Sequence, residues 1–291
     1  MSVEVQTTAA SLVADGLRLL KSSDSPRLDA EILLAFTLGL ERESIIVNPN
    51  MEVGDESVEI YRSLIERRAT REPIAYIAGT KDFYKERFIV NRSVLIPRPE
   101  TEGIVEELLK RFGDRKEMTL LDVGTGSGCI ALSVALERKE WRVTGVDISV
   151  DALTVALENK KMLGADNVSF YESDLFASVK TSATSRYDVV VSNPPYIDRA
   201  GCDDLSEDVR GFEPHLALLA DNEGLVVIER LLRDAPDYLN SGGFLLCEIG
   251  YDQKEKVRDI LKKIPGDRWN DVEFINDLSG HTRIFVVELK G

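Results

Sequence analysis

The chain has 291 residues, 43% of them hydrophobic, and a formal net charge of −15. This length favours two domains, or one domain with a large extension, and the hydrophobic content is high enough for a substantial core and argues against disorder. The acidic balance argues against nucleic acid as the main partner, because nucleic-acid binders neutralise phosphates with clustered lysine and arginine.

The cysteine and histidine content excludes further classes of protein. Cys129, Cys202 and Cys247 are far apart and form no C-x-x-C pair, which fits a reducing cytosol and neither a disulfide framework nor a zinc site. Two histidines are too few for a His-rich metal centre, so we expect no metal. The N-terminus lacks a signal-peptide core, and no apolar stretch is long enough to span a bilayer. We expect a soluble, cytoplasmic protein, with a monomer as the simplest state.

Residues 1–78 are predicted to form a helical domain. Ser25 and Pro26 are typical of a helix start, as N-cap and first helical residue. The apolar residues that follow at helical spacing are Leu28, Ile32, Ala35, Phe36 and Leu40. A further helix is predicted from Asp55 to about Arg71, with Ile60, Leu64 and Ile65 facing inward. We interpret both stripes as the core of a helical bundle.

Residues 79–99 are predicted to form a β-hairpin linker that turns near Asn91 and Arg92. A proline-rich stretch, Pro97–Glu102, then leads into a helix of about 100–112. We therefore place the catalytic domain at 100–291.

From Thr119 onward, strands and helices alternate, which predicts an α/β fold with a mostly parallel sheet. The expected strands are 119–123, 142–147, 168–172, 187–192, 244–249, 272–276 and 283–289, and the expected helices include 149–163, 223–239 and 252–264. The connection between the last two strands is too short for a helical crossover, so the last strand should be antiparallel.

A glycine-rich loop follows the first of these strands, with the sequence Asp122, Val123, Gly124, Thr125, Gly126, Ser127 and Gly128. Glycine lets a backbone turn sharply and approach a ligand closely. The dinucleotide fingerprint would need glycine in place of Cys129, and a Walker loop would need a lysine that is absent. The spacing D-x-G-x-G-x-G resembles motif I of the class I S-adenosylmethionine methyltransferases, which have a Rossmann-like fold.

Acidic residues follow the next two strands and suit the same cofactor. Asp147 can accept hydrogen bonds from a ribose diol, as acidic strand ends do in dinucleotide folds. Asp174 could accept the adenine amine, and Leu175 could cover the ring. Each acidic residue could instead be an ordinary helix cap. The glycine loop, these three residues and Asn193 form the predicted S-adenosylmethionine site.

Asn193, Pro194, Pro195 and Tyr196 follow a short apolar run and form the predicted catalytic motif. Consecutive prolines cannot donate backbone hydrogen bonds and hold the preceding residues extended, so this exit from a strand is stiff. The Asn193 side-chain oxygen and the Pro194 carbonyl could accept the two hydrogens of a planar NH2 group. Tyr196 could stack on its face. The alternative is a strand followed by a proline turn with a core tyrosine.

Several stretches together resemble the PrmC/HemK family, the release factor glutamine methyltransferases, over essentially the whole chain. They are Ser25–Glu31, Val94–Glu102, the glycine loop, Asn193–Tyr196, Glu213-Pro214 with Ala217-Leu218, and Glu248–Gly250 with Gln253. The resemblance implies methyl transfer to the glutamine amide nitrogen in the Gly-Gly-Gln motif of class 1 release factors, with the helical domain helping to recognise the factor. It also places Arg98, Glu100 and Thr101 near the active site, with no role assigned.

The main alternative is an exocyclic-amine methyltransferase acting on DNA or RNA, since such enzymes use related forms of the Asn-Pro-Pro-Tyr motif. A non-catalytic protein with a vestigial cofactor fold is the other. The loop after Tyr196 is rich in acidic residues, namely Asp198, Asp203, Asp204, Glu207, Asp208 and Glu213. Its field should attract a basic protein surface, although a solvated acidic loop explains it equally well. We expect a protein substrate, with no direct nucleic-acid contact and no membrane.

Overall fold

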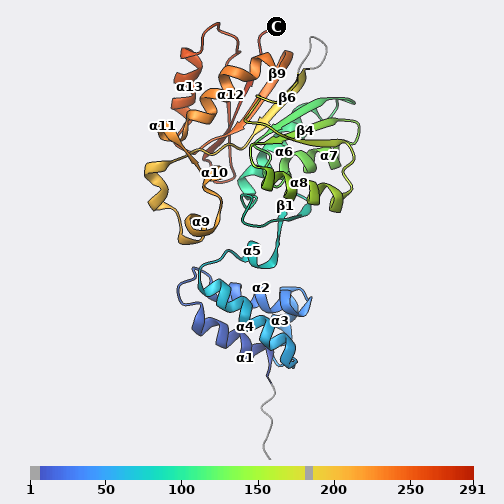
Figure 1. Cartoon of the computed structure of the whole chain (residues 1–291), viewed down its shortest axis with the longest axis vertical. Coiled ribbons are helices and arrows are strands. Elements are labelled where there is room, and N and C mark those ends of the chain that lie inside the picture. Colours follow the sequence, from blue (N-terminus) through green and yellow to red (C-terminus); the bar gives the residue numbers. More distant parts are fainter. Residues whose placement is uncertain (1–6, 181–185) are drawn as a thin grey trace, which may run out of the picture. The chain divides into compact units, whose positions relative to one another are not determined.

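The computed structural model describes residues 7–180 and 186–291, which form two compact units (Figure 1). The first unit comprises the chain up to Gly79 together with Ser206–Phe212, and the second comprises Thr80–Leu205 and Glu213–Gly291. Residues 1–6 of the predicted helical domain and residues 181–185 of the predicted catalytic domain lie outside the described residues.

The N-terminal part of the first unit is helical, as the sequence predicts. Its helices are α1 (Ala9–Leu19), α2 (Pro26–Leu38), α3 (Arg42–Val47), α4 (Asp55–Ala69) and α5 (Ile74–Ala78). Pro26 is the first residue of α2, but the Ser25 side chain makes no capping hydrogen bond and its hydroxyl donates to Asp29 instead. The segment from the far part of the chain adds α9 (Glu207–Phe212) to this unit.

The apolar faces predicted for α2 and α4 are partly wrong. Leu28, Phe36 and Leu40 are all at least 40% exposed, whereas Leu33 and Leu34 are fully buried. On α4, Ile60 is exposed and its neighbour Tyr61 is buried. Apolar residues occur on more than one side of α2, so spacing alone leaves its rotation open. Packing against the neighbouring helices α1 and α4 decides which side is buried.

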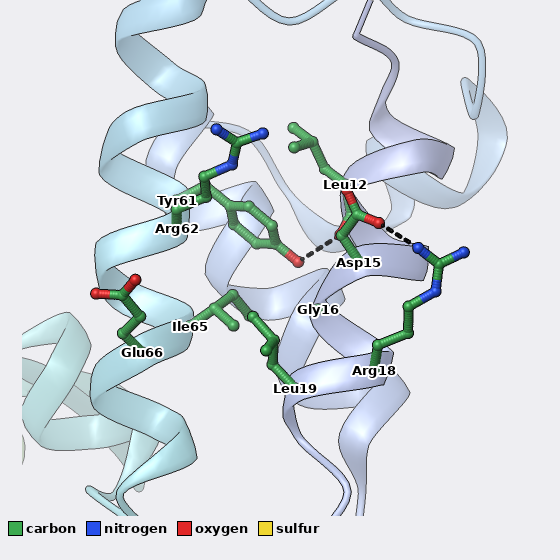
Figure 2. A pocket seen from close by; sticks show the side chains of 9 residues that line it. All are labelled: Leu12, Asp15, Gly16, Arg18, Leu19, Tyr61, Arg62, Ile65 and Glu66. Atoms are coloured by element: carbon green, nitrogen blue, oxygen red, sulfur yellow. Dashed lines mark hydrogen bonds and ion pairs between the residues drawn. The ribbon is translucent and has the colours of Figure 1, made fainter.

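Helices α1 and α4 approach each other closely at Gly16, where a Cβ atom would lie 2.4 Å from the Tyr61 hydroxyl. That buried hydroxyl donates to the Leu12 carbonyl at 3.1 Å. Beside this contact is a hollow of about 310 Å³, whose rim carries the Asp15–Arg18 ion pair (Figure 2). None of the predicted site residues lines it.

The second unit begins with the predicted hairpin, formed by β1 (Thr80–Phe83) and β2 (Glu86–Ile89). The predicted turn near Asn91 and Arg92 is wrong, because the chain reverses at Tyr84-Lys85. Tyr84 has a φ of 57°, a left-handed conformation that its side chain does not favour and that gives no turn signal in the sequence. Phe83 and Phe88, buried on the two strands, hold the hairpin in place.

The described part of the second unit contains a seven-stranded sheet of order β10-β11-β9-β6-β3-β4-β5. The strands are β3 (Thr119–Val123), β4 (Arg142–Asp147), β5 (Val168–Glu172), β6 (Tyr187–Ser192), β9 (Leu239–Glu248), β10 (Glu273–Asn276) and β11 (Thr282–Glu288). Strand β11 is antiparallel to β9 and to β10, and the remaining pairings are parallel. The predicted fold, a mostly parallel sheet with an antiparallel last strand, is confirmed.

Helices cover both faces of the sheet (Figure 1). On one face lie α6 (Glu102–Phe112), α7 (Cys129–Glu137) and α8 (Val150–Leu163), and on the other lie α12 (Val226–Asp234) and α13 (Lys254–Lys263). Successive strand residues alternate between the two cores: Val189 and Val191 face α6 and α7, and Val190 faces α12. Both faces are therefore buried, as a parallel sheet requires.

The helix predicted at 223–239 is interrupted. Asn222 and Glu223, inside the short α11 (Asp221–Gly224), adopt left-handed backbone angles, so regular helix begins only with α12. A 3-10 turn at Ala235–Asp237 then ends the helical region early. The remaining elements are short: α10 (His215–Leu218), β7 (Ile197–Asp198) paired with β8 (Leu219–Ala220), and 3-10 turns at Pro99–Thr101 and Arg199–Asp204. Within residues 7–180 and 186–291, no helix combines the length and hydrophobicity that crossing a membrane would require.

Candidate functional site

A pocket of about 300 Å³ lies at the carboxyl edge of β3, β4, β5 and β6. The carboxyl ends of parallel strands meet at one edge, so residues distant in sequence converge there. The predicted site residues that line the pocket are Gly124, Thr125, Gly126, Ser127, Asp147, Asp174, Leu175, Asn193, Pro194 and Pro195. Gly128 and Tyr196 are not among the lining residues.

The glycine loop between β3 and α7 has the conformation that its sequence suggests. Gly124, Gly126 and Gly128 all have positive φ angles, between 56° and 80°. At Gly124 and Gly126 a Cβ atom would meet only open space, so the bare backbone faces the pocket. At Gly128 it would lie 3.0 Å from Leu132 and Phe170 side-chain atoms, so this glycine serves close packing instead.

Asp122, buried under the glycine loop at the end of β3, holds the loop in place. Its side chain is fully buried and accepts a hydrogen bond from the Thr125 hydroxyl at 2.6 Å. Burial raises the pKa of this carboxyl to about 7. Asp122 is therefore a support for the loop and does not itself line the pocket.

Asp147, at the end of β4, joins the loop to the next helix. Its two carboxylate oxygens accept the Gly126 N–H at 2.8 Å and the Ser149 N–H at 2.9 Å. Burial raises the pKa of Asp147, although these hydrogen bonds counteract the rise. Each carboxylate oxygen has a second lone pair, so Asp147 can hold the loop and still accept a ribose hydroxyl.

The wall beyond β5 carries Asp174 and Leu175. The Asp174 carboxylate forms an ion pair with Arg230 at 3.0 Å, and both residues line the pocket. Leu175 has a φ of 50°, which is unusual for a leucine and turns this part of the chain along the pocket wall. The sequence did not predict Arg230, whose pairing competes with any ligand for Asp174.

Asn193 leaves β6 and is held by a chain of hydrogen bonds that the sequence did not predict. Its Nδ2 donates to the Thr101 hydroxyl at 2.9 Å, and that hydroxyl donates to Glu248 Oε2 at 2.7 Å. Glu248 ends β9 and is 1% exposed. An acidic residue ending an otherwise apolar strand was the available signal for this contact.

Tyr196 is fixed at both its side chain and its backbone. Its hydroxyl donates to Glu248 Oε1 at 3.1 Å, and its carbonyl accepts from Gln253 Nε2 at 3.0 Å. Gly224 packs so tightly on the same carbonyl that a Cβ atom there would lie 1.9 Å from it. The Tyr196 peptide group is thus held by both Gln253 and Gly224. Tyr196 does not line the pocket, and it supports the neighbouring Pro194 and Pro195, which do.

Arg98 lines another side of the pocket and is held by the buried Glu213. Glu213 accepts hydrogen bonds from the Ile96 N–H at 3.1 Å and from Arg98 at 2.5 Å. Pro97, Arg98 and Pro214 line the pocket, so this pair joins the proline-rich segment to the end of the acidic loop.

The predicted field of the acidic loop is smaller than its sequence suggests. Glu213 is buried and paired, and Asp208 forms an ion pair with Arg68 at 2.7 Å within the first unit. From the sequence, both residues are expected to be exposed charges of the loop, because the sequence does not show their partners.

The pocket fits S-adenosylmethionine. Two glycines present backbone without a Cβ atom, Asp147 has free acceptor capacity, and apolar side chains such as Leu175 and Val227 supply a wall for a flat ring. Among the described residues, no group of three or more acidic, histidine or cysteine side chains could hold a metal ion.

Known protein families match both the N-terminal helical part and the catalytic part of this chain. A family model described as the PrmC N-terminal domain matches residues 11–79, and a methyltransferase domain model matches residues 114–265. The release factor glutamine methyltransferase of Koribacter versatilis is 38% identical over 93% of this chain and 94% of its own length. The protein of the same name from Salmonella typhimurium is 40% identical over 93% of this chain and 95% of its own length.

Among solved structures, a methyltransferase from Pyrococcus furiosus is similar in fold. Its TM-score is 0.54 at 22% sequence identity, and the match covers 78% of this chain and 98% of that one. At this identity the similarity concerns the fold alone.

Proposed function

We infer the function of this chain from its family: the chain belongs to the release factor glutamine methyltransferases. We propose that it transfers the methyl group of S-adenosylmethionine to the side-chain amide nitrogen of the glutamine in the Gly-Gly-Gln motif of class 1 release factors. The observation that carries the proposal is the rigid Asn193–Pro195 segment lining the same pocket as the glycine loop.

The bound cofactor would supply an electrophilic methyl group on a sulfonium. An amide nitrogen is a poor nucleophile, because its lone pair is delocalised into the carbonyl. The Asn193 side-chain oxygen and the Pro194 carbonyl can accept its two N–H hydrogens. Both hydrogen bonds strengthen as positive charge develops on the nitrogen, so they favour the transition state over the ground state. Holding the two reactants in line can contribute about 7–11 kcal/mol.

We further propose that the N-terminal helical unit helps to recognise the release factor. The match of residues 11–79 to the PrmC N-terminal domain supports this assignment. A net charge of −15 favours a basic protein partner over the phosphate backbone of nucleic acid, so we expect no direct nucleic-acid contact. A single copy of the chain contains every residue that the proposal uses.

The proposal is tested by incubating the protein with labelled S-adenosylmethionine and a purified class 1 release factor. The controls are the same factor with its Gly-Gly-Gln glutamine replaced by alanine, duplex DNA and total RNA. We expect label on the factor and none on its Gln→Ala variant. Equal label on both forms of the factor, or label on nucleic acid alone, would overturn the proposal and favour the exocyclic-amine alternative.

A further inference from the structure

The direction of the Asn193 carboxamide decides what the pocket can bind. The oxygen and nitrogen of a carboxamide are nearly the same size, so two orientations related by a flip fit the same space. One presents an acceptor to the pocket and suits an NH2 group. The other presents a donor and would repel that group. Something besides shape must therefore select the orientation.

The hydrogen-bond chain from Glu248 makes this selection. A threonine hydroxyl has a single hydrogen, and Thr101 gives its hydrogen to Glu248 Oε2. Toward Asn193 the same hydroxyl can then offer only lone pairs. Asn193 must therefore direct its NH2 group toward Thr101, as observed, and its Oδ1 is directed away from Thr101. Within residues 7–180 and 186–291, no donor reaches Oδ1, and Asn193 lines the pocket.

We propose that Glu248 is a positioning residue. Through Thr101 it fixes the Asn193 carboxamide with its oxygen facing the group that is to be methylated, and so makes the pocket selective for NH2 groups. The inference rests on the proposed function in one respect, that the acceptor is an amide NH2.

The position of Glu248 in the fold supports a built arrangement. Cys247 on β9 pairs with Ser192 on β6, so Glu248, the last residue of β9, and Asn193, the first residue after β6, lie side by side at the carboxyl edge of the sheet. Tyr196 gives its hydroxyl hydrogen to the second Glu248 oxygen, so both oxygens act as acceptors. Burying a carboxylate is unfavourable unless hydrogen bonds replace its lost hydration, and a neutral hydrogen-bond acceptor would be less unfavourable if packing were the only role.

The test compares Thr101→Val, which keeps the side-chain shape and removes the hydroxyl, with Thr101→Ser, which keeps the hydroxyl. For Thr101→Val we expect kcat on the release factor to fall at least about tenfold, while the Kd for S-adenosylmethionine stays within about twofold. For Thr101→Ser we expect kcat within about threefold of the parent. Equal activity of Thr101→Val and the parent, or equal loss in both variants, would overturn the proposal.

A readout independent of activity separates failure of this inference from failure of the proposed function. Asparagine-selective 15N labelling reports the Asn193 side-chain NH2 signal, which is assigned by its loss in Asn193→Ala. We expect slow hydrogen exchange of this group in the parent and in Thr101→Ser, and fast exchange in Thr101→Val. Identical exchange in all three proteins contradicts the hydrogen-bond chain, whatever the substrate. A parent that fails to methylate the release factor contradicts the proposed function alone.

Discussion

Glu248 is the residue on which the binding of the methyl-accepting NH2 group depends, because it positions Asn193 through Thr101. Burial raises the pKa of its carboxyl from 4.5 to about 7, even though hydrogen bonds from Thr101 and Tyr196 and the charge of Arg283 oppose the rise. Glu100 adds to the rise through its negative charge. The ionised carboxylate can only accept, as it does from Thr101 and Tyr196, whereas a protonated carboxyl carries a hydrogen of its own that it can donate to Thr101. We therefore expect the protonation state of Glu248 to affect the orientation of Asn193.

We therefore expect kcat at saturating S-adenosylmethionine to rise with pH through about 7. In Glu248→Gln the side chain does not titrate, so kcat should be lower and this rise should be absent. The measurement is the pH profile of kcat for both proteins. An identical acidic limb in the two profiles would assign the titration to another group, such as Asp122.

The same pKa shift has a consequence for stability. The folded state binds a proton at Glu248 between pH 4.5 and about 7, where the unfolded state has released it. The free energy of unfolding should thus fall as pH rises through this interval. In Glu248→Gln the fall should be shallower, as urea titrations at a series of pH values would show. A steeper fall in the variant contradicts the raised pKa.

At the scale of the elements, the active site depends on how tightly α11 packs on the segment between β6 and β7. Gly224 combines a φ of 77° with direct contact on the Tyr196 carbonyl, so alanine would be strained and would displace the Asn193–Tyr196 segment. Gly164, at the end of α8, has a φ of 67° but open space around it. It is a matched control for backbone strain without the steric contact.

For Gly164→Ala we expect a loss of about 1 kcal/mol in the free energy of unfolding and an unchanged kcat. For Gly224→Ala we expect a larger loss of stability together with a fall in kcat of about tenfold or more. Thermal melts and initial rates on the release factor measure both. Equal kcat in the two variants would show that the contact with Tyr196 does not matter for catalysis.

The elements also show how far the sequence could be read. Strands β3, β4, β5 and β6 have the predicted bounds, because each is a short β-branched or apolar run ended by a turn signal. The rotation of α2 could not be read, because Phe36 and Leu33 are equally apolar and the neighbouring helices decide which is buried. The hairpin turn could not be read either, because Tyr84 adopts its positive φ under the demands of the strands it joins.

The site follows the same rule. The glycine loop and the double proline act through the backbone, so local sequence was enough to predict that Gly124 and Pro194 would line the pocket. The contacts of Thr101 with Glu248, and of Glu213 with Arg98, join residues over 100 positions apart. Such contacts depend on the packing of the whole sheet. Of these four residues, the resemblance places only Arg98 and Thr101 near the site, and it assigns no contact to any of them.

For the whole molecule, the notable feature is that Ser206–Phe212 belongs to the N-terminal unit. Within that unit, Asp208 forms ion pairs with Arg68 at 2.7 Å and with Arg71 at 2.6 Å, and Arg68 also binds Asp29. Both arginine side chains are largely buried, so these pairs are shielded from solvent more than ordinary surface pairs. A segment of the loop after Tyr196 is thereby anchored among helices from the other end of the chain.

We expect Asp208→Ala to free this segment. Limited proteolysis should cut between residues 199 and 213 several times faster in the variant than in the parent, because loss of the carboxylate leaves Arg68 and Arg71 without these partners. Asp204→Ala removes an exposed acidic residue of the same loop and is the control. Equal cutting rates in the two variants would mean that the ion pairs do not hold the segment.

The most direct test of the account is to map the methyl group on a release factor after incubation with the parent protein or with Asn193→Ala. With the parent, tandem mass spectrometry should place one added methyl on the side-chain amide nitrogen of the Gly-Gly-Gln glutamine. With Asn193→Ala, which loses the acceptor oxygen, the rate should fall by about 10²–10³, while S-adenosylmethionine affinity falls much less. A methyl group on any other residue, or loss of cofactor affinity in proportion to activity, would contradict the account.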